Sequence, residues 1–514
     1  MYNLQDTSLE WALLHLERFY DSDFYPRLFE FDAIKHDWTN IKSYLLNLDL
    51  EKYAPKVPVT TLAPKPNGTF RVVHQLEPLD SLIYTALIHE NLGLIESIRI
   101  PEKRRIACSY RIKPDTTGSF FDKDSIGYMD FIERAEELAK EFKDGFVLVC
   151  DIADFYNQIY LHRVNNILAE AGSKSSRVIE DFLSGLNNNI SKGIPVGPAP
   201  SIIVAEAIMA DIDKMILKYT DKFVRYVDDM YLFFNTEDEA TFFLHQLTKF
   251  LYSNHRLTIS SEKTTIIPSH YFIDIYITEE ERVEKQAIHE GIEELDTGDY
   301  PTLEEIRSFE ELEGKEKFKV RTDAYKKLLE QALEFDKLDL GLVRHILRKA
   351  GHYNVRGIIP IIFKNFKKLL PAIREVIIYF DRVLTEAVVK QYEKKFESLL
   401  SQEFLRIPFI NIWIFTLFQN DLFNKTSIAI DYKMAFRTRE KALIAKRQND
   451  KTWLKEIKDG LETLGSWDKR SCLLTAVILS EDEMKHWLGL ESSRGDAMNK
   501  AICSYAISIK KRLA

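Results

Sequence analysis

The stretch KFVRYVDDMYLFFN, residues 222–235, places two adjacent aspartates between two apolar runs. Both runs are rich in aromatic and β-branched residues, so they predict a β-hairpin that carries Asp228 and Asp229. One interpretation is an ordinary turn, because aspartate is a common turn residue. The other is a metal site, because Mg²⁺ prefers hard oxygen ligands and a cluster of carboxylates can hold two such ions. The second interpretation needs a third acid from another strand.

The segment GFVLVCDIADFYNQIY, residues 145–160, supplies such an acid. Its apolar run predicts a buried strand that ends at Asp151. Asp154, Phe155 and Tyr156 follow, and an aromatic residue at this spacing suits a nucleotide pocket in which a ring packs beneath the sugar. The plainer alternative is a helix that begins with Asp151 or Asp154 as its N-cap.

Two further segments lie between and beyond these acids. In SKGIPVGPAPS, residues 191–201, glycines and prolines predict a rigid loop whose backbone approaches a ligand, against the alternative of an ordinary breaker loop. The loop residues that we assign to substrate binding are Gly193, Pro195 and Gly197. In HRLTISSEKTTI, residues 255–266, Lys263 follows a predicted strand, RLTIS, and YFIDIYI, residues 271–277, predicts a further strand. A lysine after RLTIS suits a general acid that protonates a leaving pyrophosphate, although most lysines are simply solvated.

Upstream, TLAPKPNGTFRVVHQL, residues 61–76, predicts a hairpin around a Pro-Asn-Gly turn. Lys65 and Arg71 flank this turn, and two cations so placed suit the binding of a triphosphate. The alternative is surface charge on an edge hairpin.

Taken in order, these segments resemble the palm of the reverse transcriptase family. FVLVCDIADFY resembles its first palm motif, GIPVGPAPS its loop motif and YVDD its metal motif. The resemblance covers roughly residues 55–278 and implies two Mg²⁺ ions, with Mn²⁺ as the alternative. It assigns the metal to Asp151, Asp228, Asp229 and the carbonyl of Ile152, and dNTP selection to Tyr156 beneath the sugar. Val196 departs from the pattern, because template-copying relatives usually carry glutamine there.

The composition changes after residue 278. Acidic residues crowd residues 279–313, and the remainder consists of amphipathic stretches that predict one helix after another. Residues 344–374 hold many cations, no acid before Glu375, and interleaved aromatics. This basic run suits a nucleic-acid-binding wall, against the equal alternative of a solvated helical face. Its candidate contacts are Arg344, Arg348, Lys349, Arg356, Lys364, Lys367 and Lys368.

A reverse transcriptase palm followed directly by helical repeats resembles the abortive-infection (Abi) reverse transcriptases, in particular their shorter, prophage-borne type. The resemblance implies an α+β right-hand polymerase followed by an all-α, HEAT-like repeat domain in place of a thumb. We therefore expect fingers and palm over residues 1–278, with fingers mainly at 1–125 and palm mainly at 126–278. The helical-repeat domain would occupy residues 279–514.

The same resemblance implies a nucleotidyltransferase that polymerises dNTPs without a template. It also implies priming on a protein hydroxyl, single-stranded DNA that stays covalently attached, and a homo-oligomer, here a trimer, that defends against phage and responds to a phage component. Two alternatives remain: a template-copying reverse transcriptase of retron or intron type, and a non-catalytic sensor that binds nucleotide or a phage protein.

The composition agrees with an intracellular protein. The net charge of −9 over 514 residues argues against a surface coated in positive charge, but it leaves room for a local basic channel. The four cysteines are scattered without metal-ligand spacing, which predicts buried thiols in a reducing compartment. The N-terminus lacks the pattern of a signal peptide, and the longest apolar run, residues 407–418, is too short to span a bilayer. We therefore expect a cytoplasmic protein without a membrane segment.

Overall fold

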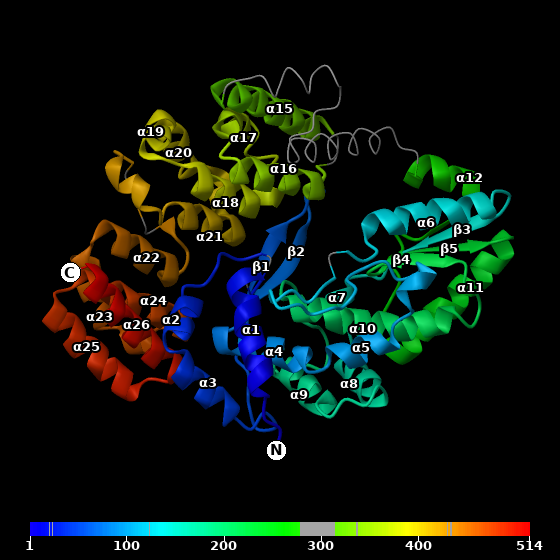
Figure 1. The fold of residues 1–514 in the computed structure, drawn as a ribbon, viewed down its shortest axis with the longest axis horizontal. Coiled ribbons are helices and arrows are strands. Elements are labelled where there is room, and N and C mark those ends of the chain that lie inside the picture. The colour runs from blue at the N-terminus through cyan, green and yellow to red at the C-terminus, as the bar shows by residue number, and fades with distance from the viewer. Residues whose placement is uncertain are drawn as a thin grey trace.

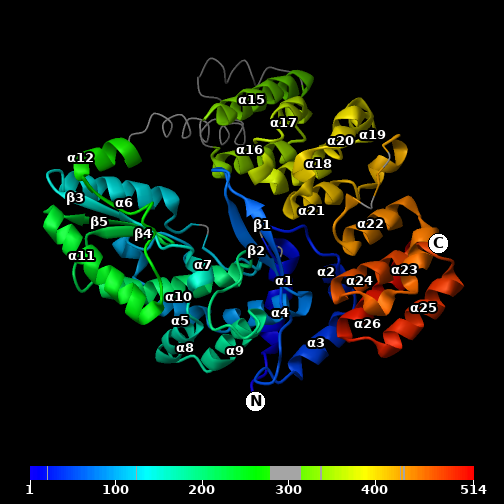
Figure 2. The same ribbon diagram turned by 180° about the vertical axis from the view of Figure 1, so that it is seen from behind.

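A computed structural model describes residues 1–19, 21–22, 24–122, 124–277, 314–335, 338–428, 430–431 and 434–513. The predicted acidic linker and the predicted domain boundary at residue 278 lie outside these residues. Figure 1 shows a sheet flanked by helices on one side of the molecule and a large group of helices on the other. A two-stranded hairpin lies between them, and Figure 2 shows the same arrangement from behind.

The larger sheet has four antiparallel strands in the order β4–β5–β3–β6. Its strands are β3 (Phe146–Cys150), β4 (Phe223–Tyr226), β5 (Asp229–Phe234) and β6 (Thr265–Pro268). Three of them match the predicted runs, and β3 lies in the centre. Side chains alternate between two cores along β3: Val147 faces one and Leu148 the other, and both are fully buried. Helices therefore cover both faces, which explains why these strands read as continuous apolar runs.

The helices of this part cover the sheet from two directions (Figure 1). One face packs against α6 (Tyr128–Glu141), and the opposite core contains α10 (Ala199–Ile216) and α11 (Glu237–Phe250). The remaining α-helices are α7 (Phe155–Gln158), α8 (Leu161–Glu170), α9 (Ser176–Leu186) and α12 (Ser269–Phe272). α10 is long and apolar almost all round because both of its sides are buried.

The first hundred residues form a helical layer and the predicted hairpin. The helices are α1 (Asp6–Phe19), α2 (Glu30–His36), α3 (Trp38–Leu46), α4 (Pro78–His89) and α5 (Leu92–Ile98). The hairpin pairs β1 (Val59–Pro64) with β2 (Phe70–Gln75) in an antiparallel register that sets Ala63 opposite Arg71. Asn67 and Gly68 close its turn, where Gly68 has a φ of +78°.

Every regular element that the structure describes beyond residue 313 is a helix, as predicted. The α-helices are α15 (Gly314–Glu334), α16 (Leu340–His352), α17 (Ile359–Lys364), α18 (Ile373–Val383), α19 (Glu386–Gln391), α20 (Glu393–Leu399), α21 (Pro408–Leu417), α22 (Thr438–Gln448), α23 (Lys451–Lys458), α24 (Ser466–Thr475), α25 (Glu481–Arg494) and α26 (Ala497–Leu513). α15 to α21 share a core with the β1–β2 hairpin, and α22 to α26 share one with α1 to α4. The HEAT-like character of these helices stays a prediction.

Two predicted strands are wrong. The segment YFIDIYI, residues 271–277, continues α12 into a π-helical turn, Ile273–Ile277, and its apolar residues Phe272, Ile273 and Tyr276 pack into the core that contains α6. Their spacing suits one face of a helix, so packing overrode the apparent alternation. The segment RLTIS, residues 256–260, contributes only an isolated bridge between Ile259 and Ile152.

A buried ionic network joins the first and last parts of the chain. Arg439 donates two hydrogen bonds to Glu30, at 2.6 and 2.8 Å, across 409 residues of sequence. Arg470 donates to Glu77 in the same manner, with one contact at 2.8 Å, and lies 3.4 Å from Glu30. All four side chains are buried, so each charge depends on its partner.

The four cysteines are free and buried, as predicted. Among the described residues, none of the helices combines the length and the apolar character needed to cross a bilayer.

We expect Glu30→Leu to lower the free energy of unfolding by about 3–5 kcal/mol, because it leaves the Arg439 guanidinium buried without its carboxylate. Chemical denaturation followed by circular dichroism measures this. The double variant Glu30→Leu/Arg439→Met should recover most of the loss, since it removes both charges. Equal loss in the two variants would contradict the ionic explanation.

His15 gives the fold a pH dependence. Burial lowers the pKa of His15 to about 4, and its Nδ1–H donates to the carbonyl of Gly118 at 2.8 Å. The unfolded chain binds a proton near pH 6.5, so stability is complete above that value and falls as the pH drops toward 4. Between pH 7 and pH 5, we expect the wild type to lose about 2 kcal/mol more than His15→Gln does, as measured by urea unfolding at both pH values.

Candidate active site

The pairing of β3 with β5 brings the predicted acids to one edge of the sheet. Cys150 lies opposite Met230, so Asp151 and Asp229 follow at the same end of the two strands. Asp228 occupies the two-residue turn between β4 and β5. All three acids line a cavity of about 800 Å³. The sequence therefore predicted correctly that residues 77 positions apart share one site.

The turn that presents Asp228 is strained and held by a buried network. Val227 has a φ of +56°, a left-handed conformation that is costly for a β-branched residue. Its N–H donates to Ser109 Oγ at 3.0 Å, and its carbonyl accepts from Arg225 Nη1 at 3.2 Å. Arg225 is itself fully buried and paired with two acids of α10, Glu206 and Asp213. These contacts fix the turn in the conformation that aims Asp228 at the cavity.

The sequence analysis missed this supporting network. Its signal was present within the opening stretch: Arg225 is a charge inside an apolar strand, and such a charge needs buried partners. Other lining residues that it missed are Tyr110 and Tyr226, whose rings lie 6.0 Å apart. Tyr110 comes from a loop without a recognisable motif, so only the fold could place it.

The acids repel one another in a partly dry site. Burial raises the pKa of Asp228 and of Asp229 above the ordinary aspartate value, and the charge of Asp151 raises both further. Lys263 Nζ lies 2.8 Å from Asp151 Oδ2 and offsets part of this charge. The side chain of Lys263 is 65% exposed, which leaves it free to contact a ligand as well. It lies in the turn before β6 and not after a strand, because RLTIS forms only a bridge.

The donor types at this edge suit a divalent metal ion. Three carboxylates line the cavity, and the backbone bridge to Ile259 uses the carbonyl of Asp151 and the N–H of Ala153, which leaves the Ile152 carbonyl out of that bridge. Within the described part of the chain, however, no three acids, histidines or cysteines converge as a ligand group for a metal. The oxygen donors at this edge are thus of the kind that Mg²⁺ prefers. Their side chains, however, are not arranged as a converging group of metal ligands.

The predicted cations of the β1–β2 hairpin face the same cavity. Lys65 and Arg71 both line it. Burial lowers the pKa of Lys65, and the neighbouring charges of Arg71 and Lys263 lower it further. Three cations that repel one another beside an acidic cluster form a good site for an anion such as a triphosphate.

The segment after Asp151 builds the floor of the cavity, as predicted. Asp154, Phe155 and Tyr156 all line it, with Phe155 buried in the main core. Asp154 adopts a left-handed φ of +49° and accepts a hydrogen bond from Asn157 at 2.7 Å. This turn sends the chain directly into α7 and sets the Tyr156 ring beside the acids.

Only part of the glycine-proline loop reaches the cavity. Gly197 lines it, together with Val196 and Pro198. Gly193 and Pro195 are not among its lining residues, so the structure does not bring them beside the acids, and their role in substrate binding stays a prediction. Gly193 instead donates to the carbonyl of Ile159 at 2.8 Å and thereby ties the loop to the end of α7.

The basic run of the C-terminal helices divides in two. Arg344 and Arg348 of α16 line the cavity that holds the acids, together with Arg374 and the buried Glu375 of α18. The other predicted contacts do not line it; they are Lys349, Arg356, Lys364, Lys367 and Lys368. Arg356 and Lys368 donate to backbone carbonyls of neighbouring helices. The aromatics Phe363 and Phe366 pack against other rings, which agrees with the alternative that this run is an ordinary helical face.

Gly197→Ala should distort the loop beside the cavity. Gly197 has a φ of +129°, and an added Cβ would lie 2.4 Å from Ser22 Oγ and 3.1 Å from the carbonyl of His74. We expect a loss of stability of about 1–3 kcal/mol and weaker dNTP binding, measured by thermal unfolding and by calorimetry. The control is Gly93→Ala in α5, where an added Cβ meets nothing within 4 Å; it should leave dNTP binding unchanged and should not lower stability, because alanine favours the helix.

Comparisons with known proteins agree with this geometry. Residues 63–286 match the family model of reverse transcriptase (RNA-dependent DNA polymerase). A search of curated proteins finds no match. Among solved structures, the apo telomerase of Candida tropicalis is 11% identical over 74% of this chain and 73% of that chain, with a TM-score of 0.36.

The telomerase of Candida albicans in complex with a fragment of telomeric RNA is 12% identical over 81% of this chain and 70% of that chain, with a TM-score of 0.31. Because both TM-scores are low, these two structures add nothing to the assignment, which comes from the family match. That match includes the three acids and the two cations of the hairpin, Lys65 and Arg71. Residues 63–286 therefore match a reverse transcriptase domain, and a domain of this type indicates a polymerase of the nucleotidyltransferase class.

Proposed function

We propose that the protein is an abortive-infection polymerase of the shorter, prophage-borne type, which joins dNTPs without copying a template. The first nucleotide would be joined to a hydroxyl of the protein, so that the single-stranded DNA product stays attached. The homo-oligomer, the phage trigger and the HEAT-like nature of the helices belong to the same proposal. The observation that carries it is the wall of arginines that the C-terminal helices contribute to the same cavity as the acids.

This wall limits the space above the acids. Arg344 and Arg348 come from α16, and Arg374 comes from the first turn of α18. The cavity they enclose with the palm measures about 800 Å³, which lies in the range of sites for a single small ligand. Such a space accommodates an incoming nucleotide and the end of a single strand far more readily than a primer–template duplex. Guanidinium groups there also suit the phosphates of that strand.

Val196 supports the absence of templating. Val196 lines the cavity, at a position where template-copying reverse transcriptases usually carry glutamine. The backbone of Val196 is bound on both sides by His74: its N–H donates to His74 Nδ1 at 3.0 Å, and its carbonyl accepts from the His74 N–H at 2.9 Å. The position is thus held rigidly and presents an apolar side chain to the cavity.

The residues of the site have distinct roles in nucleotide transfer. Asp151, Asp228 and Asp229, with the Ile152 carbonyl, are the groups that would hold two divalent ions, which lower the pKa of an attacking hydroxyl and neutralise charge on the α-phosphate. Lys65 and Arg71 bind the triphosphate and orient it along the hairpin. Lys263 lies within reach of the same region and can donate a proton to the departing pyrophosphate. Tyr156 packs beneath the sugar and disfavours a 2′-hydroxyl.

The decisive experiment uses the purified full-length protein with labelled dNTPs and Mg²⁺ in the absence of nucleic acid. We expect label that migrates with the protein on a denaturing gel and that protease digestion releases. Asp228→Asn should reduce this labelling by at least about 100-fold, because it removes a carboxylate from the reacting centre. The matched control is Asp238→Asn, an exposed aspartate at the start of α11, which should label like the wild type.

A primed RNA template separates this proposal from template-copying synthesis. We expect the same products with and without it. Products whose sequence follows the template would overturn the proposal in favour of a retron- or intron-type enzyme, and labelling that is absent from wild type and Asp228→Asn alike would favour a non-catalytic sensor.

A further inference from the structure

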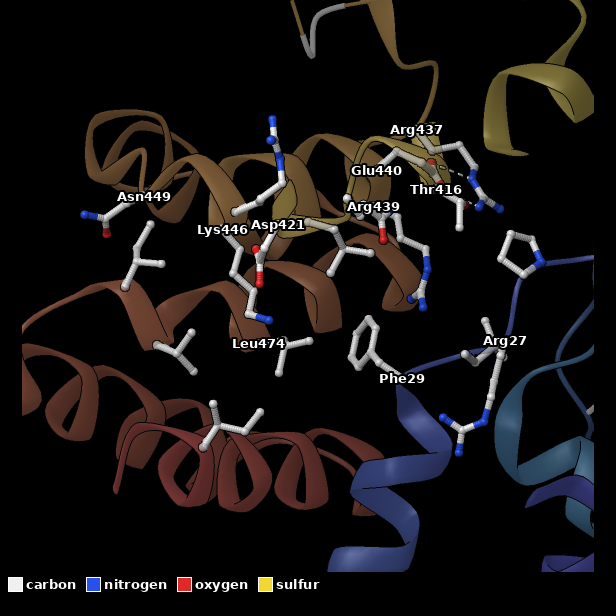
Figure 3. A pocket seen from close by; sticks show the side chains of 18 of the residues that line it. Arg27, Phe29, Thr416, Asp421, Arg437, Arg439, Glu440, Lys446, Asn449 and Leu474 are labelled. Atoms are coloured by element: carbon white, nitrogen blue, oxygen red, sulfur yellow. Dashed lines mark hydrogen bonds and ion pairs between the residues drawn. The ribbon is translucent and has the colours of Figure 1, made fainter. Parts of the chain in front are cut away.

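A second cavity, of about 770 Å³, lies between the N-terminal layer and the last helices. Its walls come from the segment before α2, from the end of α21, from α22 and from α24, with Gln75 of β2 at one side. Figure 3 shows cationic side chains of α22 above the cavity, and Leu474 and Phe29 below them. Among the described residues, this cavity and the carboxylate cavity share no lining side chain.

The lining is strongly cationic. Seven basic side chains and two acidic ones line the cavity. The basic ones are Arg27, Arg437, Arg439, Lys446, Arg447, Lys451 and Lys510, and the acidic ones are Asp421 and Glu440. Such an excess at the surface of a protein with a net charge of −9 is local and is not a property of the whole chain.

Several of these cations already have partners. Arg439 binds Glu30, Arg437 binds Glu440, and Lys510 donates to two carbonyls at the end of a helical turn. Lys446 differs from them. Its side chain is partly buried and, in the described part of the chain, forms no hydrogen bond and no ion pair. Burial lowers the pKa of Lys446, and the charge of Asp421 in the same lining offsets this only in part. An ammonium so placed lowers stability, and an anion bound beside it would offset that cost.

Arg447, the next residue, has a similar deficit. Its Nη1 donates to Asn424 at 2.9 Å, but its buried Nε has no partner. Burial lowers the pKa of Arg447 as well. Arg447 thus leaves one buried donor without a partner, and Lys446 adds an unpaired cation to the same lining, a combination that suits an anion site.

Seven apolar residues also line the cavity. Leu28, Phe29, Leu443, Leu474, Val477, Ile478 and Ile509 face the same space. The Phe29 ring lies 4.5 Å from the Arg439 guanidinium, so a planar cation and an aromatic face border the cavity together. A bare phosphate would leave this apolar surface unused, whereas a nucleotide combines phosphates with a planar base.

We propose that this cavity is a nucleotide-binding site, separate from the carboxylate cavity, in which Lys446 and Arg447 bind the phosphates and the apolar lining accommodates the base. Its volume lies in the range of sites for small ligands. The proposal stands on this cavity alone and does not depend on untemplated or protein-primed synthesis. Gln75, which lines this cavity, lies four residues along β2 from Arg71.

The test is calorimetric titration of the full-length protein with dATP in EDTA. Lys65→Ala/Arg71→Ala serves as the background, because it removes the triphosphate contacts of the carboxylate cavity. We expect one site to remain, and Lys446→Ala in this background to weaken it by roughly tenfold or more. The matched control is Lys441→Ala, which lies on the same helix but does not line the cavity, and it should leave the affinity unchanged. An absent site, or an affinity that Lys446→Ala does not change, would overturn the proposal.

Two further measurements sharpen the outcome. Inorganic tripolyphosphate should bind the same site more weakly than dATP; equal affinity would exclude recognition of the base and overturn the nucleotide assignment. A short oligonucleotide that binds there while dATP does not would also overturn it, in favour of a nucleic-acid strand. Lys446→Met should melt at the same or a higher temperature, because it removes an unpaired charge. A large fall in melting temperature would assign Lys446 a structural role instead.

Discussion

The antiparallel register of β3 and β5 is the constraint on which the catalytic cavity depends. Because side chains alternate along a strand, a slip of one residue would exchange the two apolar faces, and both of those faces are covered by helices. The two cores therefore fix the register, and the register sets Asp151 level with Asp229. The hairpin then adds Asp228 through a strained turn that the buried Arg225 holds in place. Apolar packing thus determines the positions of charges that it does not contact.

The C-terminal helices contact the first part of the chain at two places. α16 and α18 supply arginines to the cavity, whereas α22 to α26 share a core with the first helices of the chain. The β1–β2 hairpin lies between these groups, and its second strand contributes Arg71 to one cavity and Gln75 to the other. The helical part is therefore integrated with the palm through a hairpin that borders both cavities.

The sequence predicted the parts of the site that carry strong local patterns. Asp151 ends an apolar strand, Asp228 and Asp229 occupy a hairpin, and Lys65 and Arg71 flank a turn, so short-range rules found all of them. It assigned Gly193 and Pro195 to substrate binding, but they do not line the cavity, because spacing does not show which side of a loop faces inward. It also read YFIDIYI as a strand, since apolar alternation over a few residues fits a helix face equally well. The second cavity has no local pattern, because its lining comes from segments as distant as Pro26 and Lys510.

The ion pairs that join Glu30 to Arg439 and Glu77 to Arg470 also bear on the order in which the protein folds during synthesis. The two glutamates leave the ribosome roughly 400 residues before their partners, and each occupies a position that becomes buried. A nascent chain that does not yet include Arg439 and Arg470 cannot bury these acids without a large electrostatic penalty. The N-terminal layer therefore acquires its final packing only after Arg470 has left the ribosome, so shorter chains lack stable packing around α2 and α4.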